Sequence, residues 1–134
     1  MPALQNLVLT DRQTTPVAHT FVPQTVTKEG VAIVNEITGA AIGDPRYTIS
    51  TRRASGKMKT RVTFHVPVVQ TETINGISKP KIVREGVIDA TFTFSLESTE
   101  AERNNAIGMF ADSLGVSKTL VNDTIVKGQG VWGA

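Results

Sequence analysis

Six basic side chains gather in the middle of the chain, in an interval that contains no acidic residue. The interval lies between Asp44 and Glu72. Guanidinium and ammonium groups pair with phosphates, so this distribution predicts a polyanionic partner for the middle of the chain. A solvated sheet face that is kept positive for solubility is the alternative interpretation. The six residues are Arg46, Arg52, Arg53, Lys57, Lys59 and Arg61.

Catalysis and metal binding find little support in the remaining side chains. Asp89 stands among threonines, and no second carboxylate or histidine has a spacing that would assist it in acid–base chemistry. His19 and His65 are far apart, and the absence of cysteine excludes disulfides, thiolate catalysis and the usual zinc sites. We therefore expect no enzyme activity, no catalytic residue, no metal, no cofactor and no small-molecule substrate. For His65 we expect a surface position without a special role.

The composition is that of one folded domain. Of the 134 residues, 40% are hydrophobic and 19% are charged, whereas aromatic residues make up only 5%. No segment approaches the roughly 18 consecutive apolar residues of a membrane span. The N-terminus lacks the basic and apolar regions of a secretory signal. We expect a protein of a reducing compartment that has no membrane partner.

Three segments of the middle part alternate between hydrophilic and apolar side chains. They cover residues 46–52, 61–66 and 88–96. A period of two is typical of strands that have one buried and one polar face. The basic residues at 46, 52 and 61 all fall on the hydrophilic side. The pattern therefore predicts a sheet whose polar face carries most of the cluster.

Shorter runs and turn residues complete the expected sheet. Runs rich in Val, Leu, Thr and Phe predict strands near the N-terminus, and a segment with Gly and Pro predicts a loop after them. A turn is expected within residues 53–59. Asn75-Gly76 favours a tight turn inside a longer connection that ends at Pro80. The N-terminal strands are expected over residues 4–9, 19–26 and 31–37, and the loop over 38–45.

The last third changes to a helical period. Thr99 and Glu102 match a capping box at the start of a helix. Apolar residues then recur at helical spacing, and Gly115 is the expected stop. A second, shorter helix is expected from a cap at Ser117 to a point before Gly128. The fold class expected is α+β, in a single domain with an N-terminal hairpin region (1–26), an antiparallel sheet (27–97), helices (98–128) and a C-terminal tail (129–134).

A helix of about 15 residues is roughly 22 Å long and covers only part of a sheet face. A monomer would leave an apolar patch, and such patches usually mark an interface. We therefore expect an obligate dimer whose helices lie across the sheet of the partner. The expected dimer-interface residues are Ile107, Phe110, Ala111 and Leu114.

An ordered set of segments resembles the coat protein of small single-stranded RNA bacteriophages, the leviviruses. The resemblance extends from about Arg46 to Leu114. Its segments are Arg46–Ser50, Val62–Pro67, Asn75-Gly76 with Pro80, Ile88–Ser95 and Ser98–Arg103.

The resemblance implies an N-terminal hairpin, a five-stranded antiparallel sheet and two helices, in an interlocked dimer with a continuous ten-stranded sheet. It further implies a quasi-icosahedral, T=3 shell around a single-stranded RNA genome, assembled in the cytoplasm of the bacterial host. The inward polar face binds RNA in this family. In well-known members it binds a hairpin and thereby represses translation. The virion is then the place where the protein is found.

Carried over to this chain, the RNA-facing residues combine basic and hydroxyl side chains, which contact phosphates and bases. The family's stacking tyrosine is replaced by Val87, and base–aromatic stacking is worth about 1–3 kcal/mol. Tight binding of a hairpin operator therefore lacks one expected contact. The RNA-binding set comprises Arg46, Thr48, Ser50, Arg52, Lys57, Lys59, Arg61, Thr63, Val87, Asp89 and Thr91.

The resemblance also predicts a polar loop that gathers around the symmetry axes of the shell. A small dimeric cellular RNA-binding module without capsid assembly is the alternative function, but such a module should need stacking aromatics on its exposed face. The expected loop comprises Thr71, Glu72, Thr73, Ile74, Asn75, Gly76, Ile77, Ser78 and Lys79.

Overall fold

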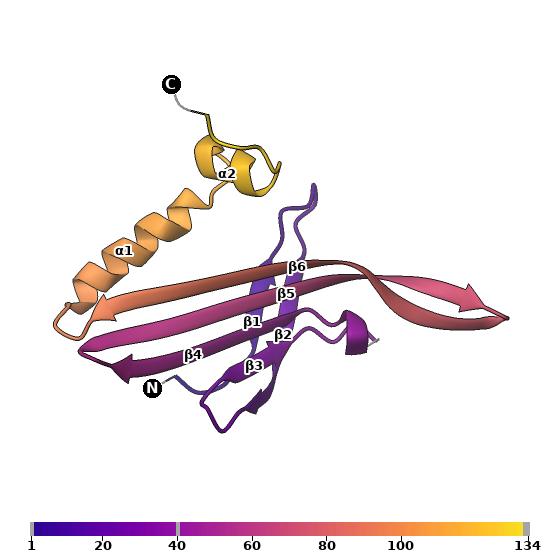
Figure 1. The fold of residues 1–134 in the computed structure, drawn as a ribbon, viewed down its shortest axis with the longest axis horizontal. Helices are drawn as coiled ribbons and strands as arrows, with labels where there is room; N and C mark the ends of the chain where they lie inside the picture. Colours follow the sequence, from indigo (N-terminus) through magenta and orange to yellow (C-terminus); the bar gives the residue numbers. More distant parts are fainter. Residues whose placement is uncertain (1, 40, 133–134) are drawn as a thin grey trace. The chain divides into compact units, whose positions relative to one another are not determined.

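A computed structural model describes residues 2–39 and 41–132 (Figure 1). Contacts divide the chain into two compact units, one ending at Thr93 and the other beginning at Phe94. The chain forms six strands, a short 3₁₀ turn and two helices. In chain order these are β1 (Leu7–Thr10), β2 (Ala18–Val26), β3 (Ala32–Asn35), the 3₁₀ turn (Ala41–Gly43), β4 (Arg46–Ala54), β5 (Lys57–Ile74), β6 (Ile77–Ser95), α1 (Glu100–Ser113) and α2 (Thr119–Ile125).

The strands form one sheet in the order β1-β2-β3-β4-β5-β6. Each strand is antiparallel to the next from β1 to β5, and a hairpin turn joins β5 to β6. β2 pairs with β1 in the N-terminal hairpin and with β3 in the rest of the sheet, so it belongs to both. The predicted antiparallel sheet followed by two helices is therefore confirmed, with six strands in a single order.

Two-residue turns connect β4 to β5 and β5 to β6. Ser55 and Gly56 have φ values of 53° and 72°, and Asn75 and Gly76 have 53° and 78°. Positive φ at both central residues is the mark of a type I′ turn, whose twist matches that of the flanking strands. Pairing can therefore continue up to the turn on both sides.

The expected longer connection around Asn75-Gly76 is wrong. Residues 71–74 end β5 and residues 77–79 begin β6, so the segment is the tip of a hairpin rather than an open loop. Pro80 lies within β6, which is an edge strand of this sheet, and an edge strand tolerates the missing N–H of proline. Figure 1 shows this tip extending beyond the other strands of the sheet.

The sheet has a small core on its apolar face. Among the described residues only Phe21 and Val34 are buried, at 2% and 7% exposure. The ring of Phe64 packs edge-on against Phe21 at 5.6 Å and against Tyr47 at 5.7 Å between centroids. Ile49, whose register partner is Val62, remains 43% exposed on the same face. The apolar face is thus incompletely covered in a single chain.

The helical unit begins as predicted. Thr99 is the N-cap of α1, and its hydroxyl accepts a hydrogen bond from the backbone N–H of Glu102 at 3.2 Å. Lys118, not Ser117, occupies the N-cap position of α2, and it makes no side-chain cap bond. None of the residues of α1 is buried. No helix in the described part of the chain is long and apolar enough to cross a membrane.

Candidate nucleic-acid interface

The pairing of β4 with β5 separates hydrophilic from apolar side chains, as the period-two pattern predicts. Thr48 lies opposite Thr63, and Ser50 lies opposite Arg61, whereas Tyr47 and Ile49 lie opposite Phe64 and Val62. Directly paired residues of antiparallel strands share one face of the sheet. The hydrophilic set on these two strands is Arg46, Thr48, Ser50, Arg52, Lys57, Lys59, Arg61, Thr63 and His65.

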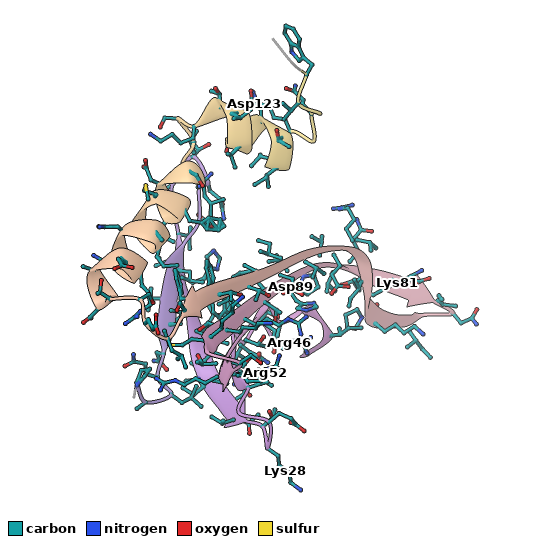
Figure 2. The ribbon with its side chains drawn as sticks, turned by 60° about the vertical axis from the view of Figure 1, so that its left-hand side comes forward. Lys28, Arg46, Arg52, Lys81, Asp89 and Asp123 are labelled. Atoms are coloured by element: carbon teal, nitrogen blue, oxygen red, sulfur yellow. The ribbon has the colours of Figure 1, made fainter. Side chains whose placement is uncertain are left out.

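Side-chain contacts add the odd-numbered residues of β6 to this face. Arg61 on β5 reaches Asp89 on β6, and His65 reaches Glu85. Side chains alternate along a strand, so residues 87 and 91 share the face of Asp89. We call the hydrophilic set of β4 and β5, together with Glu85, Val87, Asp89 and Thr91, the polar sheet face. All eleven predicted RNA-binding residues belong to it. Figure 2 labels Arg46, Arg52 and Asp89 on this part of the sheet, with Lys81 farther along the β5–β6 hairpin.

One basic residue of the predicted cluster lies elsewhere. Arg53 is the register partner of Met58, on the face opposite to the polar sheet face. The register therefore places Arg53 outside the polar sheet face.

Four cations of the polar sheet face are exposed and make no ion pair with any described residue. Two of them, Arg52 and Lys59, lie directly opposite each other on β4 and β5. Like charges in directly opposed positions destabilise a sheet, and an anion between them relieves the repulsion. This arrangement favours phosphate binding. The four cations are Arg46, Arg52, Lys57 and Lys59.

Arg61 differs from these four because it is held by a carboxylate. Its Nε and Nη2 atoms lie 3.1 and 2.6 Å from Oδ1 and Oδ2 of Asp89, which forms a two-point hydrogen-bonded ion pair. This hydrogen bonding lowers the pKa of Asp89 and raises the pKa of Arg61. Both groups therefore stay charged at neutral pH.

Hydroxyl groups and one aliphatic side chain fill the rest of the face. The hydroxyls of Thr48 and Thr63 hydrogen-bond to each other across the strands. Val87 is 58% exposed. Tyr47 cannot take the place of the missing stacking ring, because it packs on Phe64 on the opposite face, where burial raises the pKa of its hydroxyl. The residues that define this face thus include no Phe, Tyr or Trp ring on which a base could stack.

The alternation of residues 61–66 predicts His65 on this face, whereas the sequence pattern does not predict Glu85 as its partner. The Nδ1 atom of His65 lies 3.1 Å from Oε1 of Glu85. Their spacing of twenty residues carries no local signal. Only the register between β5 and β6 brings them together.

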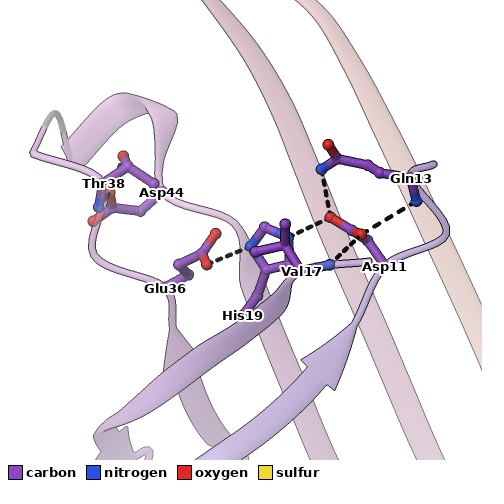
Figure 3. A network of polar contacts seen from close by, with 7 residues as sticks. All are labelled: Asp11, Gln13, Val17, His19, Glu36, Thr38 and Asp44. Atoms are coloured by element: carbon purple, nitrogen blue, oxygen red, sulfur yellow. Dashed lines mark hydrogen bonds and ion pairs between the residues drawn. The ribbon is translucent and has the colours of Figure 1, made fainter. Parts of the chain in front are cut away.

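A second polar cluster, also missed, surrounds His19 in the N-terminal hairpin (Figure 3). Its Nδ1 atom lies 2.6 Å from Oε2 of Glu36, and its Nε2 atom lies 2.7 Å from Oδ2 of Asp11. The backbone N–H of Val17 donates to Oδ1 of Asp11 at 2.9 Å, and Gln13 also donates to this carboxylate. The hydrogen bonds raise the pKa of His19 and hold the pKa of Asp11 well below its usual range. Because both ring nitrogens face carboxylates, the cluster is an ion-pair bridge. Among the described residues, no set of three or more His, Cys, Asp or Glu side chains is arranged to hold a metal ion.

The other predicted site residues lie on α1 and on the β5–β6 hairpin. The α1 side chains Ile107, Phe110 and Leu114 are 39%, 42% and 41% exposed, and Ala111 is exposed as well. The residues predicted for the symmetry axes, 71–79, form the hairpin tip described above.

Comparison with known proteins agrees with this architecture. Residues 2–132 match the family model described as "Levivirus coat protein". The chain is 48% identical over 130 residues to the capsid protein of Pseudomonas phage PRR1, and this alignment covers 96% of the chain and 98% of its relative.

Solved structures show the same fold. The virus-like particle of bacteriophage ESE058 matches with a TM-score of 0.83 at 22% identity, covering 98% of this chain and 100% of the other. The capsid protein of bacteriophage GA matches with a TM-score of 0.82 at 21% identity, covering 97% and 98%. The chain therefore belongs to the levivirus coat protein family and is a structural capsid protein of a phage virion, not an enzyme.

Proposed function

We propose that dimers of this chain assemble into a quasi-icosahedral, T=3 shell that encloses a single-stranded RNA genome, with the polar sheet face turned toward the RNA. The observation that carries the proposal is the gathering on that face of cations that make no ion pair with any described residue, including Arg52 directly opposite Lys59. Repulsion between them is relieved by a phosphate backbone, which is the anion that a shell of this kind encloses. The names of the relatives, a capsid protein and a virus-like particle, support the shell.

The dimer is proposed to join two sheets edge to edge and to interlock their helices. β6 is 19 residues long and has a strand neighbour on one side only. Its free edge carries backbone N–H and C=O groups that a second copy of β6 can pair with. Such pairing of two five-stranded sheets, β2 to β6 in each subunit, gives a continuous sheet of ten strands.

The apolar side chains of α1 supply the second part of the proposed dimer interface. Their exposed fractions of 39–42% are high for a helix that has to be stabilised by packing. The apolar sheet face also lacks cover, since Ile49 and Val66 are 43% and 38% exposed. Packing of the helices of one subunit on the sheet of its partner removes both surfaces from water. The interface residues proposed are Ile107, Phe110, Ala111 and Leu114.

RNA binding on the polar sheet face is proposed to rest mainly on charge. Arg46, Arg52, Lys57 and Lys59 contact phosphates, and the hydroxyls of Thr48, Ser50, Thr63 and Thr91 donate to or accept from bases. Translational repression through an RNA hairpin is proposed as a secondary role. With Val87 in place of a stacking ring, that hairpin complex lacks about 1–3 kcal/mol of base stacking.

The hairpin tip formed by residues 71–79 is proposed to gather around the symmetry axes of the shell, and assembly is proposed to take place in the cytoplasm of the bacterial host. The tip extends beyond the other strands of its sheet, which leaves it free to meet copies from neighbouring dimers (Figure 1). Different conformations of the tip in different subunits of a solved shell are the expected result. Identical conformations in all subunits would contradict this part of the proposal.

Negative-stain microscopy of the protein expressed alone in bacteria tests the shell, and absorbance at 260 and 280 nm of the same fractions tests the RNA. Uniform spherical particles that contain nucleic acid are the expected result. A soluble dimer without particles would support the alternative function, a small dimeric RNA-binding module. Particles free of nucleic acid would support the shell but contradict RNA binding.

A further inference from the structure

The polar sheet face is divided into two parts that differ in charge pairing. On β4 and the adjoining part of β5, the cations make no ion pair with described residues. On the side of β6, each of the two carboxylates, Asp89 and Glu85, holds a basic residue of β5. Arg61 lies at the boundary, because it is the register partner of Ser50 on β4 while its guanidinium reaches Asp89 on β6. The fifth cation of the face is therefore neutralised by the protein itself.

We propose that Asp89 is a positioning residue that holds Arg61 away from RNA phosphates and thereby limits how tightly the polar sheet face binds RNA of any sequence. This inference rests on the RNA-binding function proposed above. The phosphate contacts are then made by Arg46, Arg52, Lys57 and Lys59, and Arg61 makes none.

The geometry of the ion pair supports this role. Asp89 engages the Nε–Nη2 edge of the Arg61 guanidinium at two points, at 3.1 and 2.6 Å. A phosphate makes its favourable two-point contact with the same kind of edge, so phosphate and carboxylate compete for it. Each oxygen of Asp89 already accepts a hydrogen bond from Arg61, which reduces the capacity of this carboxylate to accept from a base.

The location of the pair makes this competition relevant to RNA. The side chains of Arg61 and Asp89 are 62% and 47% exposed, so an RNA lying on the face can reach both. The negative charge of Asp89 also repels a phosphate at this point of the face. Arg52 and Lys59 have no such restraint, and their mutual repulsion favours an added anion. The expected result is a face whose phosphate contacts lie over β4 and the nearby half of β5.

Replacement of Asp89 by Asn tests the proposal because it removes the charge and retains the shape. Binding is measured by fluorescence anisotropy with a labelled oligouridylate, which forms no hairpin, at salt concentrations between about 50 and 200 mM. Size-exclusion chromatography first establishes that all variants have the same assembly state. Asp89→Asn is expected to bind a few-fold more tightly at the lowest salt. The plot of log K against log salt should become steeper by about 0.7, the value for one more phosphate contact on a single strand.

Three further variants separate the release of Arg61 from a general change in charge. Glu85→Gln removes a carboxylate from the same strand and face, but it frees no arginine for a phosphate contact. Its salt slope should therefore match that of the native protein. Arg61→Gln combined with Asp89→Asn should return the slope to the native value. Asp89→Glu retains the carboxylate and should behave as the native protein, which keeps the proposal testable if Asp89→Asn folds poorly.

The outcomes distinguish this proposal from the one on which it rests. Weaker binding by Asp89→Asn would overturn the proposal, because it would mean that Asp89 contacts RNA directly. An equal gain in slope for Glu85→Gln would also overturn it, since charge alone would then explain the effect. If the native protein shows no salt-dependent binding of oligouridylate, the RNA-binding function itself fails, and the role of Asp89 fails with it.

Discussion

Nε2 of His19 lies 2.7 Å from Oδ2 of Asp11, and its Nδ1 lies 2.6 Å from Oε2 of Glu36. A neutral imidazole has one N–H, so two ionised acceptors require the doubly protonated ring. Asp11 follows β1, His19 lies in β2 and Glu36 follows β3. One cation therefore links three consecutive strands of the sheet at the place where the N-terminal hairpin joins it.

This bridge predicts a pH dependence of stability with a definite sign. The folded-state pKa of His19 is raised above its ordinary value of 6.5, so its contribution is complete below 6.5 and is lost as the pH rises through the folded-state pKa. The pKa of Asp11 is lowered from 3.8, so its contribution is complete above 3.8 and is lost as the pH falls through the lower value. The bridge should stabilise the fold most between these two ordinary values.

Thermal unfolding of His19→Gln and of the native protein, followed by circular dichroism over a pH series, measures this effect. The difference in midpoint should be largest between pH 3.8 and 6.5 and should shrink above that range. His65→Gln is the control, since His65 contacts a single carboxylate at 3.1 Å. A difference for His19→Gln that stays constant as the pH rises would contradict the bridge.

The register of β4 and β5 predicts that neighbouring arginines contribute unequally to RNA content. Arg52→Ala removes an unpaired cation of the polar sheet face, whereas Arg53→Ala removes one from the opposite face. Particles of Arg52→Ala should contain less RNA, and the salt slope of RNA binding should decrease by about 0.7. Arg53→Ala should leave both quantities unchanged. Arg61→Ala should have a smaller effect than Arg52→Ala, because Asp89 already neutralises Arg61.

Absorbance at 260 and 280 nm of purified particles gives the RNA content of each variant. Equal loss of RNA in Arg52→Ala and Arg53→Ala would mean that RNA does not distinguish the two faces. Undiminished RNA in Arg52→Ala would contradict the assignment of the polar sheet face as the RNA-binding surface.

The dimer proposal predicts that Phe110→Asp prevents assembly. Phe110 is 42% exposed in the single chain and lies on the α1 stripe with Ile107 and Leu114. In an interlocked dimer the new carboxylate would be buried without a partner, which costs several kcal/mol. Met109 is 70% exposed and lies one residue away, about 100° around the helix. Met109→Asp is therefore the matched control, and it should yield particles in normal amounts in the microscope. Intact particles from Phe110→Asp would place the interface elsewhere.

The faces of the sheet could be predicted from the sequence because alternation is a local property. In residues 46–52 and 61–66, the alternation of polar and apolar side chains predicts the face of the sheet on which each residue lies. The register of β4 with β5 confirms this prediction. For the hairpin tip the sequence predicts a longer connection that ends at Pro80, and the family resemblance predicts a polar loop over residues 71–79. An edge position and a type I′ turn at Asn75-Gly76 outweigh both signals.

The ion pairs could not be predicted, because they depend on register between distant strands. Arg61 and Asp89 are 28 residues apart, and a shift of one residue between β5 and β6 would send their side chains to opposite faces. The bridge at His19 needs the pairing of β1 with β2 and also the place where the chain leaves β3. Neither the pairing of these strands nor the end of β3 can be read from the spacing of the residues in the sequence.

Restoring an aromatic ring at position 87 should strengthen binding of a hairpin with unpaired loop bases. Val87 is 58% exposed on the polar sheet face, so a tyrosine there can present its ring to a base without entering the core. Stacking of one base is worth about 1–3 kcal/mol, which corresponds to a roughly 5- to 150-fold gain in affinity. The salt slope should stay constant, because no phosphate contact is added.

Ile88→Tyr is the matched control, since Ile88 is 61% exposed and alternation places it on the opposite face. Filter binding with a hairpin and with an oligouridylate measures both affinities for each variant. A gain for Ile88→Tyr equal to that for Val87→Tyr would show that the ring acts without regard to the face, and would leave Val87 with no part in RNA recognition.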